Sequence, residues 1–580
     1  MTDDDALTDD DAITDGAADL PDDASPDDYA DASPDDRADL HDDASPDDHA
    51  DLHEADLRPP IDRREVIGLA AILALAAILR LWALPGRGTW DADQGHDMLV
   101  LLGMVRDGTL PLLGPPTSIG AFHHGALYYF LLAPAAFLSG ADPTVVVAEI
   151  ALLGVAAVGV TWYLARSIGG PVAGFTAGLI MAISASAIDE STFIWNPNLI
   201  ALSSSIALAA AWHARTTGRP RWWLLAAFGA LVTMQCHVLG IALLPPIVFL
   251  WVATRRGTAV GRERVRYDRY GLGGLAIIVI GYLPLLIHEL GHDFAETRAA
   301  FAFVASGGTG VSISLPVRLV FVGLRILAWP LTGLLVNGLI IGVVASVTVA
   351  SGLAWRTRAR DRAERAAARW LALTLLFGWI VLTFGASGLA SVTPLPVDHY
   401  HAFLDPVVFV ALGLGTAAVW RGAGAAPGPT IQRVVLVVSL GILIGWNVSI
   451  WPPSVAIDGG WPAAQATGDR IQAITGTRPI QLIGLPDFKS TEAIGFPLER
   501  RGLAVVEDIP PTTTLAPPPA GRDPTAAVIA VCDSLFVVDC GGPAEDAAVT
   551  APGAWPVGLS LVDRWSAAPG RTVSVYLPSR

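Results

Sequence analysis

Residues 61–98 read IDRREVIGLAAILALAAILRLWALPGRGTWDADQGHDM, and this stretch decides the fold. Two arginines open it, a long apolar run follows, and three aspartates within seven residues close it. An apolar run of about 20 residues is long enough to cross a bilayer as a helix. Because positive charge marks the cytoplasmic flank of such a helix, the three aspartates, Asp91, Asp93 and Asp97, are expected on the outer side.

The chain as a whole has the composition of an integral membrane protein, since 52% of its 580 residues are hydrophobic. Its charge is concentrated at the N-terminus. Residues 1–58 hold 23 acidic residues against Arg37 and Arg58, a net charge of −21, whereas the whole chain carries −18 and the remainder is close to neutral at +3. Repeats of the form DDASPDD cannot bury enough apolar surface to offset chain entropy. Residues 1–60 are therefore expected to be a disordered acidic tail in the cytoplasm, either a solubilising extension or an electrostatic tether.

Eleven apolar segments are candidate membrane helices. They are residues 65–84, 144–165, 171–188, 198–214, 222–236, 237–254, 271–288, 331–354, 369–388, 402–420 and 432–450. Eleven spans put the basic segments 213–221, 254–269 and 356–369 on the cytoplasmic side with the N-terminus, as the positive-inside rule requires. The predicted fold is an α-helical multi-pass membrane protein with a cytoplasmic N-terminus and with residues 452–580 outside. A further apolar segment, 311–329, contains a proline and two arginines and is better suited to the membrane interface.

The same topology places chemically distinctive loops on the outer side. The first, residues 85–143, holds WDADQGHD and AFHHGALYYF, the second reads IDESTFIWNPN, and the last ends in VDHYHAF. Ionisable side chains at a membrane are costly and often functional, although each of these alone is also explained by packing. Together they predict a site that accepts a lipid with a charged head group. The candidate ligands are His123, His124, Glu190, Asn196, Asn198, His237, Glu289, His399, Tyr400 and His401.

The first outer loop is predicted to contain two surface helices. From Asp93 onward, apolar residues between 98 and 105 recur at helical spacing. Such a helix would lie on the membrane surface with its apolar stripe down. Asp93 and Asp97, four positions apart, would share a flank at the water–lipid boundary, whereas Asp91 precedes the helix and is also suited to be its N-cap. A second apolar run at 126–138 predicts the second interfacial helix.

The order of these features resembles the GT-C glycosyltransferases, and more closely the bacterial members of glycosyltransferase family 39, the protein O-mannosyltransferase-like group. The resemblance is carried by WDADQGHDMLVLLGMVRDGTLPLLGPPTSIG, HHGALYYFLLAP and FIWNPNLIAL, and it extends over residues 62–450. It implies a transmembrane catalytic module, residues 61–451, in the cell membrane. This module would transfer a hexose or pentose from a polyprenyl-phosphate carrier to an acceptor on the extracytoplasmic face.

The resemblance also implies a role for the acidic loop. The carboxylate that opens the loop would be the general base that deprotonates the acceptor hydroxyl. The family usually has an acidic pair, often Asp-Glu, whereas here Gln94 follows Asp93. We place the base at Asp93, with Asp91 as the first alternative and Asp97 as the second. This chemistry requires no cofactor, although a divalent cation is compatible with it.

The expected partners follow from the same reaction. They are a polyprenyl-phosphate-linked sugar, the lipid bilayer, and an acceptor that is a protein, a lipid or a glycan; nucleic acid is not expected. The five histidines and Tyr400 among the candidate ligands would donate hydrogen bonds to the leaving phosphate, because basic residues are few at the outer face. Trp195 and Tyr128 would either stack on the sugar ring or anchor the chain at the interface.

Two other functions remain as alternatives. Residues 288–292 read HELGH, which matches the H-E-x-x-H motif of zinc proteases. Gly291 weakens the helix at this point, and no partner motif is evident in the sequence, so an intramembrane zinc metalloprotease is the weaker hypothesis. His288 and Glu289 would instead line the glycosyltransferase cavity. A flippase or transporter for lipid-linked sugars would share that cavity and would need no base.

Residues 452–580 are predicted to form a small extracytoplasmic α/β domain. Strands are expected in AAVIAVCDSLFVV, and GLSLVDRW with RTVSVYLP reads as a hairpin. The domain sequence shows no nucleophile–base constellation, so the domain either assists acceptor or carrier binding or gives structural support. Cys532 and Cys540 would form a disulfide across a tight turn in an oxidising compartment, or would remain free thiols.

Overall fold

The computed structural model of the chain describes residues 60–117, 122–306, 314–333, 335–385, 399–422, 428–451, 456, 458–486, 491–507, 522–534, 539–551 and 554–579. The chain from His49 to Arg580 forms one compact unit. The predicted acidic tail, residues 1–60, lies outside the described residues apart from Pro60.

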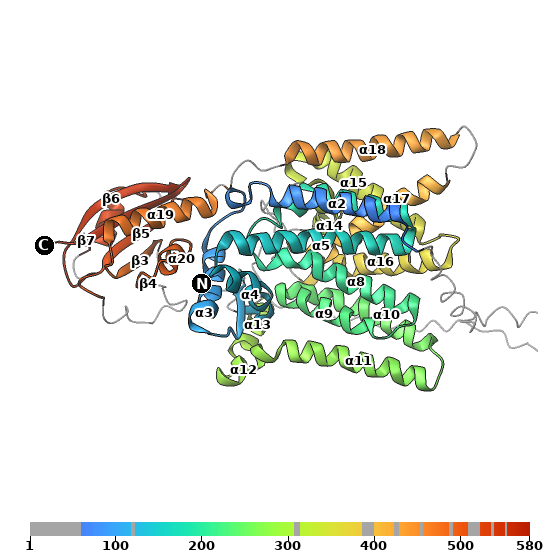
Figure 1. The fold of residues 1–580 in the computed structure, drawn as a ribbon, viewed down its shortest axis with the longest axis horizontal. Helices are drawn as coiled ribbons and strands as arrows, with labels where there is room; N and C mark the ends of the chain where they lie inside the picture. Colours follow the sequence, from blue (N-terminus) through green and yellow to red (C-terminus); the bar gives the residue numbers. More distant parts are fainter. Residues whose placement is uncertain are drawn as a thin grey trace, which may run out of the picture. The chain divides into compact units, whose positions relative to one another are not determined.

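Within the described ranges, twelve long helices make up the membrane part of the molecule, and Figure 1 shows many of them running side by side. They are α2 (Arg63–Leu81), α5 (Pro143–Gly169), α6 (Pro171–Ile183), α8 (Ile200–Thr217), α9 (Trp222–Cys236), α10 (Leu244–Gly257), α11 (Arg262–Gly281), α14 (Leu315–Thr332), α15 (Leu335–Arg356), α16 (Arg362–Ile380), α17 (Asp405–Gly422) and α18 (Gly428–Ile450). Each predicted span overlaps one of these helices.

Not all of these helices are long enough to cross a membrane unaided. Seven helical segments of the described chain have the required length and apolar composition, or eight if α11 and α12 (Leu283–Gly291), which meet at 45°, form one span. The helices α6 and α9 are apolar but shorter. The chain is therefore a multi-pass membrane protein, and the count of eleven spans stays a prediction.

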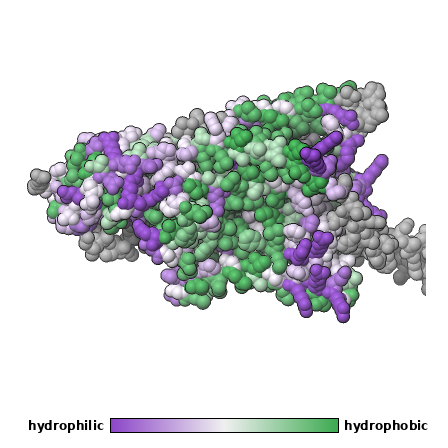
Figure 2. Space-filling view, in the orientation of Figure 1, coloured by the Kyte–Doolittle hydropathy of each residue, from purple (hydrophilic) through white to green (hydrophobic). Residues whose placement is uncertain are grey.

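The surface of the bundle is divided along the helix axes. Figure 2 shows hydrophobic residues over the middle of the bundle and hydrophilic residues at the end where α10 meets α11. Ion pairs join helix ends that the sequence places in the cytoplasm. Arg166 of α5 pairs with Glu65 of α2, and Glu364 of α16 binds Arg356 at 3.0 Å and Arg421 at 2.9 Å. We call this the basic end, and the opposite end, which carries the first outer loop, the loop end.

The helix α14 covers most of the segment that was predicted to lie at the interface. Near its start, the Trp379 indole donates to the carbonyl of Leu319 at 2.9 Å; near its end, the Ser184 hydroxyl donates to the carbonyl of Pro330 at 2.7 Å. Both partners lie where α16 and α6 reach the loop end. Length and composition would allow α14 to cross a membrane, but these contacts favour the predicted interfacial position.

The predicted span 171–188 is broken into α6 and a short helix, α7 (Ala185–Asp189). The last carbonyls of a helix have no partner within the helix, and here a fully buried arginine supplies one. Arg80 of α2 donates to the carbonyls of Ala182 at 3.0 Å and Met181 at 3.2 Å. Ser184 caps the next helix by accepting from the N–H of Ala187. A charge inside an apolar segment thus has a structural role at the break.

The C-terminal residues form a sheet flanked by helices, as predicted. The five strands have the order β4-β3-β5-β7-β6, in which β3 pairs in parallel with β4 and β5 while β7 pairs antiparallel with β5 and β6. The predicted hairpin is β6–β7. The elements of this sheet domain are α19 (Gly460–Thr475), β3 (Ile480–Leu485), α20 (Glu492–Arg500), β4 (Val505–Glu507), β5 (Ala527–Asp533), α21 (Pro543–Val549), β6 (Leu559–Ala568) and β7 (Arg571–Pro578).

Candidate functional site

The first outer loop folds into two helices joined by a small antiparallel pair of strands. They are α3 (Ala92–Asp107), β1 (Leu113–Pro116), β2 (His123–Gly125) and α4 (Leu127–Ser139), and both helices fall where the sequence predicts them. The apolar stripe of α3 does not face lipid. Met98 and Leu101 are fully buried in the protein core, because α4 packs against that face. The predicted placement of the stripe on the membrane surface is therefore wrong.

The three aspartates of the loop have three different environments, and that of Asp97 is the most enclosed. Its carboxylate accepts hydrogen bonds from the Tyr128 hydroxyl at 2.9 Å and the Tyr129 hydroxyl at 2.8 Å. Burial raises the pKa of Asp97 to about 7, although the two tyrosines oppose the shift. Asp97 is therefore not at the water–lipid boundary as predicted, and the fully buried Tyr128 is not an interface anchor.

Asp91 is the N-cap of α3, as the sequence allowed. Its N–H donates to Oε1 of Gln94 at 2.9 Å, which is half of a capping box. Its carboxylate forms an ion pair with Arg571 at the start of β7, with a closest distance of 2.5 Å. Asp91 is thus engaged by the helix and by the sheet domain.

Asp93 lies between these two residues and is exposed on the first turn of α3. Its neighbour Gln94 is buried and uses both ends of its amide: Oε1 accepts from Asp91, and Nε2 donates to the carbonyl of Ile194 at 2.9 Å. A glutamate, the residue expected from the family resemblance, has no donor for the second bond when ionised. The departure from the Asp-Glu pattern is therefore explained by local hydrogen bonding.

Four of the predicted ligands come together as one group of rings, which we call the histidine cluster: His124 of β2, His237, His399 and Tyr400. The ring centres of His237 lie 5.3 Å from His124, 5.0 Å from His399 and 5.5 Å from Tyr400. Trp195 of the second outer loop contacts the edge of the cluster, with its ring centre 4.2 Å from that of His399. Residues far apart in the sequence thus build one polar aromatic surface.

The two buried histidines of the cluster, His124 and His237, are neutral. Burial and the neighbouring imidazole of His123 lower the pKa of His124 to about 4, and burial with the rings of His399 and His124 lowers the pKa of His237 well below its ordinary value. Nδ1 of His237 accepts from the N–H of Leu239 at 3.2 Å, so the neutral ring carries its proton on Nε2. His124 and His237 therefore offer hydrogen bonds rather than positive charge.

The two predicted asparagines shape the second outer loop. Nδ2 of Asn196 donates to the carbonyl of Cys236 at 2.5 Å, and Nδ2 of Asn198 donates to the carbonyl of Phe193 at 2.8 Å. Glu190 accepts from the indole of Trp329 at 2.9 Å. These side chains hold the loop against α9 and α14, and their predicted role in substrate binding stays a prediction.

The remaining predicted ligands have separate partners. His401 lies 2.7 Å from Asp405 and both are buried. The N–H of His123 donates to Glu296 of α13 (Ala295–Ala305) at 2.6 Å, and its ring nitrogen lies 3.1 Å from the same carboxylate. These contacts tie His401 to the start of α17 and His123 to α13.

In the HELGH segment the two histidine rings stack on each other, and one oxygen of the glutamate is held by a neighbouring helix. The rings of His288 and His292 stack with their centres 3.9 Å apart. Glu289 is buried and accepts from both the N–H of Thr297 at 2.8 Å and its hydroxyl at 2.7 Å. Within the described part of the chain, no group of three or more His, Cys, Asp or Glu side chains could hold a metal ion. These residues give the protease hypothesis no support.

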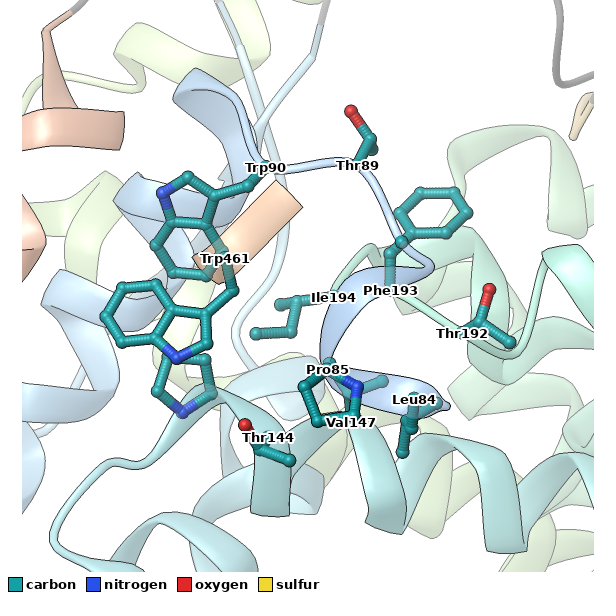
Figure 3. A pocket seen from close by; sticks show the side chains of 12 residues that line it. Leu84, Pro85, Thr89, Trp90, Thr144, Val147, Thr192, Phe193, Ile194 and Trp461 are labelled. Carbon is teal, nitrogen blue, oxygen red and sulfur yellow. The ribbon is translucent and has the colours of Figure 1, made fainter. Parts of the chain in front are cut away.

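A small pocket opens beside the start of α3. Figure 3 shows the Trp90 and Trp461 side chains next to each other on one side of it and Pro85, Phe193 and Thr192 on the other. The lining comes from the first outer loop, the second outer loop, α5 and the sheet domain. Four segments of the chain therefore meet at Trp90, just before the first turn of α3.

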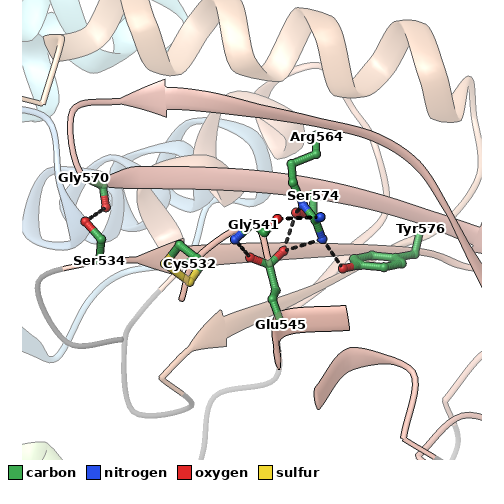
Figure 4. The surroundings of a disulfide bond; sticks show 9 residues. Cys532, Ser534, Gly541, Glu545, Arg564, Gly570, Ser574 and Tyr576 are labelled. Carbon is green, nitrogen blue, oxygen red and sulfur yellow. Dashed lines mark hydrogen bonds and ion pairs between the residues drawn. A yellow bond between two sulfur atoms is a disulfide. The ribbon is translucent and has the colours of Figure 1, made fainter. Parts of the chain in front are cut away.

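The edge of the sheet domain that reaches α3 is stabilised by a disulfide. Cys532 and Cys540 are bonded, with their Cα atoms 5.6 Å apart, which confirms the predicted bridge. Figure 4 shows this bond beside the turn at Gly570, where the Ser534 hydroxyl donates to the Gly570 carbonyl at 3.1 Å. The next residue, Arg571, is the partner of Asp91. The same figure shows Glu545 bridging Ser574 and Arg564 below the strands.

The sequence did not predict the residues of the sheet domain that contact α3. Arg571 pairs with Asp91, Glu492 contacts the ring of His96, and Asp458 accepts from the N–H of Trp90 just before α3. Each pair joins residues hundreds of positions apart, and a single sequence carries no signal that pairs them. Tyr128 and Tyr129 were visible as an aromatic pair in the loop, and a tyrosine pair beside a helical aspartate could have suggested a hydrogen bond. For Gln94, the sequence indicates only a departure from the family pattern.

The helical bundle, the helical first loop and the C-terminal sheet domain together define the GT-C fold, which confirms the fold predicted from the sequence. Residues 123–288 match the family model described as dolichyl-phosphate-mannose-protein mannosyltransferase. This segment begins after α3, so the three aspartates lie outside it.

Two solved structures share the fold over most of the chain. ArnT from Cupriavidus metallidurans in the apo state is 15% identical with a TM-score of 0.56, and the alignment covers 87% of this chain and 97% of that one. The same protein bound to undecaprenyl phosphate is 15% identical with a TM-score of 0.56, covering 88% and 97%. A comparison with curated protein sequences gave no match.

Proposed function

We propose that the chain is a membrane glycosyltransferase that moves a sugar from a polyprenyl-phosphate donor to a hydroxyl of an extracytoplasmic acceptor, with Asp93 as the general base. The observation that carries this proposal is a link through the second outer loop. Gln94, next to Asp93, hydrogen-bonds to Ile194, and Trp195, next to Ile194, contacts His399. An exposed carboxylate and a polar aromatic surface are thereby joined at the loop end.

The environments of the three aspartates support the choice of base. A base must reach the hydroxyl that it deprotonates. Asp97 is buried and its two oxygens accept from tyrosines, and Asp91 is ion-paired with Arg571. Asp93 is the exposed member of the three, so its carboxylate is the one that an acceptor arriving from solvent can reach.

The proposed reaction is a single displacement. The acceptor oxygen forms a bond to the anomeric carbon while its proton passes to the carboxylate of Asp93. The bond between the anomeric carbon and the phosphate oxygen breaks, and its electron pair leaves with the polyprenyl phosphate. Because the buried imidazoles of His124 and His237 are neutral, we assign the histidine cluster to hydrogen bonds with the polar groups of the donor, with Trp195 available to stack on a sugar ring.

The comparisons support the donor class by similarity of fold. One of the two ArnT structures is bound to undecaprenyl phosphate, and the description of the matching family model includes dolichyl-phosphate mannose. A polyprenyl-phosphate sugar, hexose or pentose, is the shared chemistry. The acceptor is a protein, a lipid or a glycan, and the active site faces away from the cytoplasm.

Transfer by the purified protein in lipid nanodiscs tests the proposal. Polyprenyl-phosphate mannose, glucose and arabinose, each labelled in the sugar, are offered with extracted cell-envelope acceptors. We expect Asp93→Asn to slow transfer about 10²–10⁴-fold, the usual contribution of a general base. Asp107→Asn is the matched control, since Asp107 is exposed at the far end of the same helix.

The outcomes separate the alternatives. Transfer that survives Asp93→Asn but is lost in Asp91→Asn moves the base to Asp91. A wild-type protein that transfers none of the three sugars, but moves the labelled donor across the bilayer, is a transporter, and the enzyme proposal is then wrong.

A further inference from the structure

We propose that the sheet domain positions the general base: it holds the first turn of α3, and Arg571 is the main positioning residue. The inference rests on the proposed function, in which Asp93 is the base. It gives the C-terminal domain a catalytic purpose in place of general structural support.

The first contact is the ion pair between Arg571 and Asp91. The Arg571 side chain is 11% exposed, and its guanidinium lies 2.5 Å from the Asp91 carboxylate and 3.5 Å from the carbonyl of Trp90. A partly buried arginine–carboxylate pair is stronger than one on the open surface. Asp91 precedes Asp93 by two residues, so this pair fixes the start of the helical turn that carries the base.

The second contact is made by Trp90. Its indole N–H donates to the carbonyl of Ala493 in α20 at 2.8 Å, and its ring packs against Trp461 and Phe496 with centres 4.6 Å and 5.6 Å away. The backbone N–H of Trp90 donates to Asp458 at 2.7 Å. Trp90 is therefore enclosed by the sheet domain.

The third contact lies on the other side of Asp93. Gly95 meets the backbone of α20 so closely that a Cβ there would lie 2.4 Å from the carbonyl carbon of Glu492. The next residue, His96, has its Nδ1 2.7 Å from the Glu492 carboxylate. The sheet domain thus contacts α3 immediately before and immediately after the base.

The bundle holds α3 through different residues. Gln94 binds Ile194 of the second outer loop, and Asp97 binds Tyr128 and Tyr129 of α4. The buried flank of α3 is therefore held by residues outside the sheet domain. The first turn of a helix has unpaired N–H groups and frays easily. Without the sheet domain, the bundle would hold this turn through the side chain of Gln94, and displacement of a catalytic group by about 1 Å can cost about 10²-fold in rate.

Kinetics with whichever of the three polyprenyl-phosphate sugars the wild type transfers test the positioning role. We expect Arg571→Gln and Asp91→Asn each to lower kcat about tenfold with KM for the donor unchanged, since asparagine keeps the N-cap but loses the charge. The double variant should lose no more than either single variant, because the two residues act through one contact. Arg571→Lys should recover part of the loss. Arg470→Gln, which breaks the ion pair with Asp563 elsewhere in the domain, is the control that should keep kcat.

Amide hydrogen exchange gives a readout that needs no activity. Residues 91–97 should exchange faster in Arg571→Gln than in the wild type, and Arg470→Gln should leave their exchange rates unchanged.

Unchanged exchange in Arg571→Gln overturns the inference, as does a wild-type kcat in that variant. Abolished transfer in Asp91→Asn with normal transfer in Arg571→Gln also overturns it, because Asp91 would then be the base. A wild-type protein without any transfer activity refutes the proposed function, whereas the exchange experiment still decides whether the domain holds α3.

Discussion

Tyr129 donates its hydroxyl hydrogen to Oδ1 of Asp97 over 2.8 Å, and both side chains are enclosed by the protein. Tyr128 makes the equivalent bond to Oδ2 at 2.9 Å. Two residues of α4 therefore bind one residue of α3, and the two helices of the first outer loop are joined through a single buried carboxyl group.

This arrangement predicts a pH dependence of stability. Burial raises the pKa of Asp97 from 3.8 to about 7, so between these values the folded protein binds a proton that the unfolded chain releases. The contribution of Asp97 to stability is therefore present below pH 4 and is lost as the pH rises through 7.

Asp97→Asn should remove this dependence of stability on pH. Melting temperatures at pH 5 and pH 8 should differ more in the wild type than in Asp97→Asn, with Asp107→Asn as the control that behaves like the wild type. Equal pH dependence in the wild type and Asp97→Asn would contradict the prediction.

Gln94→Glu tests the hydrogen bonding at the first turn of α3. The substitution restores the Asp-Glu pair that the family resemblance predicts, but it replaces an N–H donor with a carboxylate oxygen facing the carbonyl of Ile194. Loss of a buried hydrogen-bond partner costs about 1–3 kcal/mol. We expect a lower melting temperature and slower transfer in Gln94→Glu, and a smaller effect in Gln94→Met, which has no charge to bury. A variant Gln94→Glu as stable as the wild type would show that the second loop does not depend on this bond.

The sequence predicted those parts of the fold that local pattern determines. Apolar runs located the helices, the basic segments located one end of the bundle, and the alternating pattern at 559–578 located the β6–β7 hairpin. The disulfide between Cys532 and Cys540 was one of two alternatives that the sequence left open, and the structure contains it. These features depend on neighbouring residues and on composition, which one sequence contains.

The sequence predicted which kinds of residue gather at the site, but it did not predict which of them touch one another. The histidine cluster contains four of the ten predicted ligands, because all four lie on loops at one membrane face. The burial of Asp97 could not be predicted, since periodicity shows which residues share a face of α3 but not whether lipid or α4 covers it. The pairing of Asp91 with Arg571 joins residues 480 positions apart and depends on how the sheet domain folds back on the first loop.

Gly95→Ala should weaken the packing of α3 against α20 of the sheet domain. A Cβ on Gly95 would lie 2.4 Å from backbone atoms of Glu492 and 2.5 Å from the nitrogen of Ala493, which cannot move as a flexible side chain would. Overpacking of this kind typically costs about 1–3 kcal/mol. Gly291→Ala is the matched control, because Gly291 is also helical and has nothing within 4 Å of a new Cβ. We expect a lower melting temperature for Gly95→Ala only; an unchanged value would mean that α20 is not pressed against α3.

The HELGH segment is expected to act through Glu289 as a helix cap. Its carboxylate accepts the N–H of Thr297 in the first turn of α13, and loss of such a cap costs about 1 kcal/mol. Glu289→Ala should therefore lower the melting temperature slightly and leave sugar transfer within about twofold, as judged from that small cost. The zinc chelator 1,10-phenanthroline should not change transfer. Hydrolysis of casein that stops with the chelator and in Glu289→Gln would instead establish the protease.

Removal of the disulfide should weaken the edge of the sheet domain that carries Arg571. The bond joins positions eight apart, and closure of so short a loop contributes about 2–3 kcal/mol. In the sheet, Asp533, which follows Cys532, pairs with Arg571, so loss of the disulfide should also weaken the ion pair between Arg571 and Asp91.

We expect the double variant Cys532→Ala/Cys540→Ala to have a lower melting temperature and to show faster amide exchange at residues 91–97. Treatment of the wild type with dithiothreitol should reproduce both effects, while adding no further change to the double variant. A lower melting temperature without faster exchange at 91–97 would confine the role of the disulfide to the sheet domain.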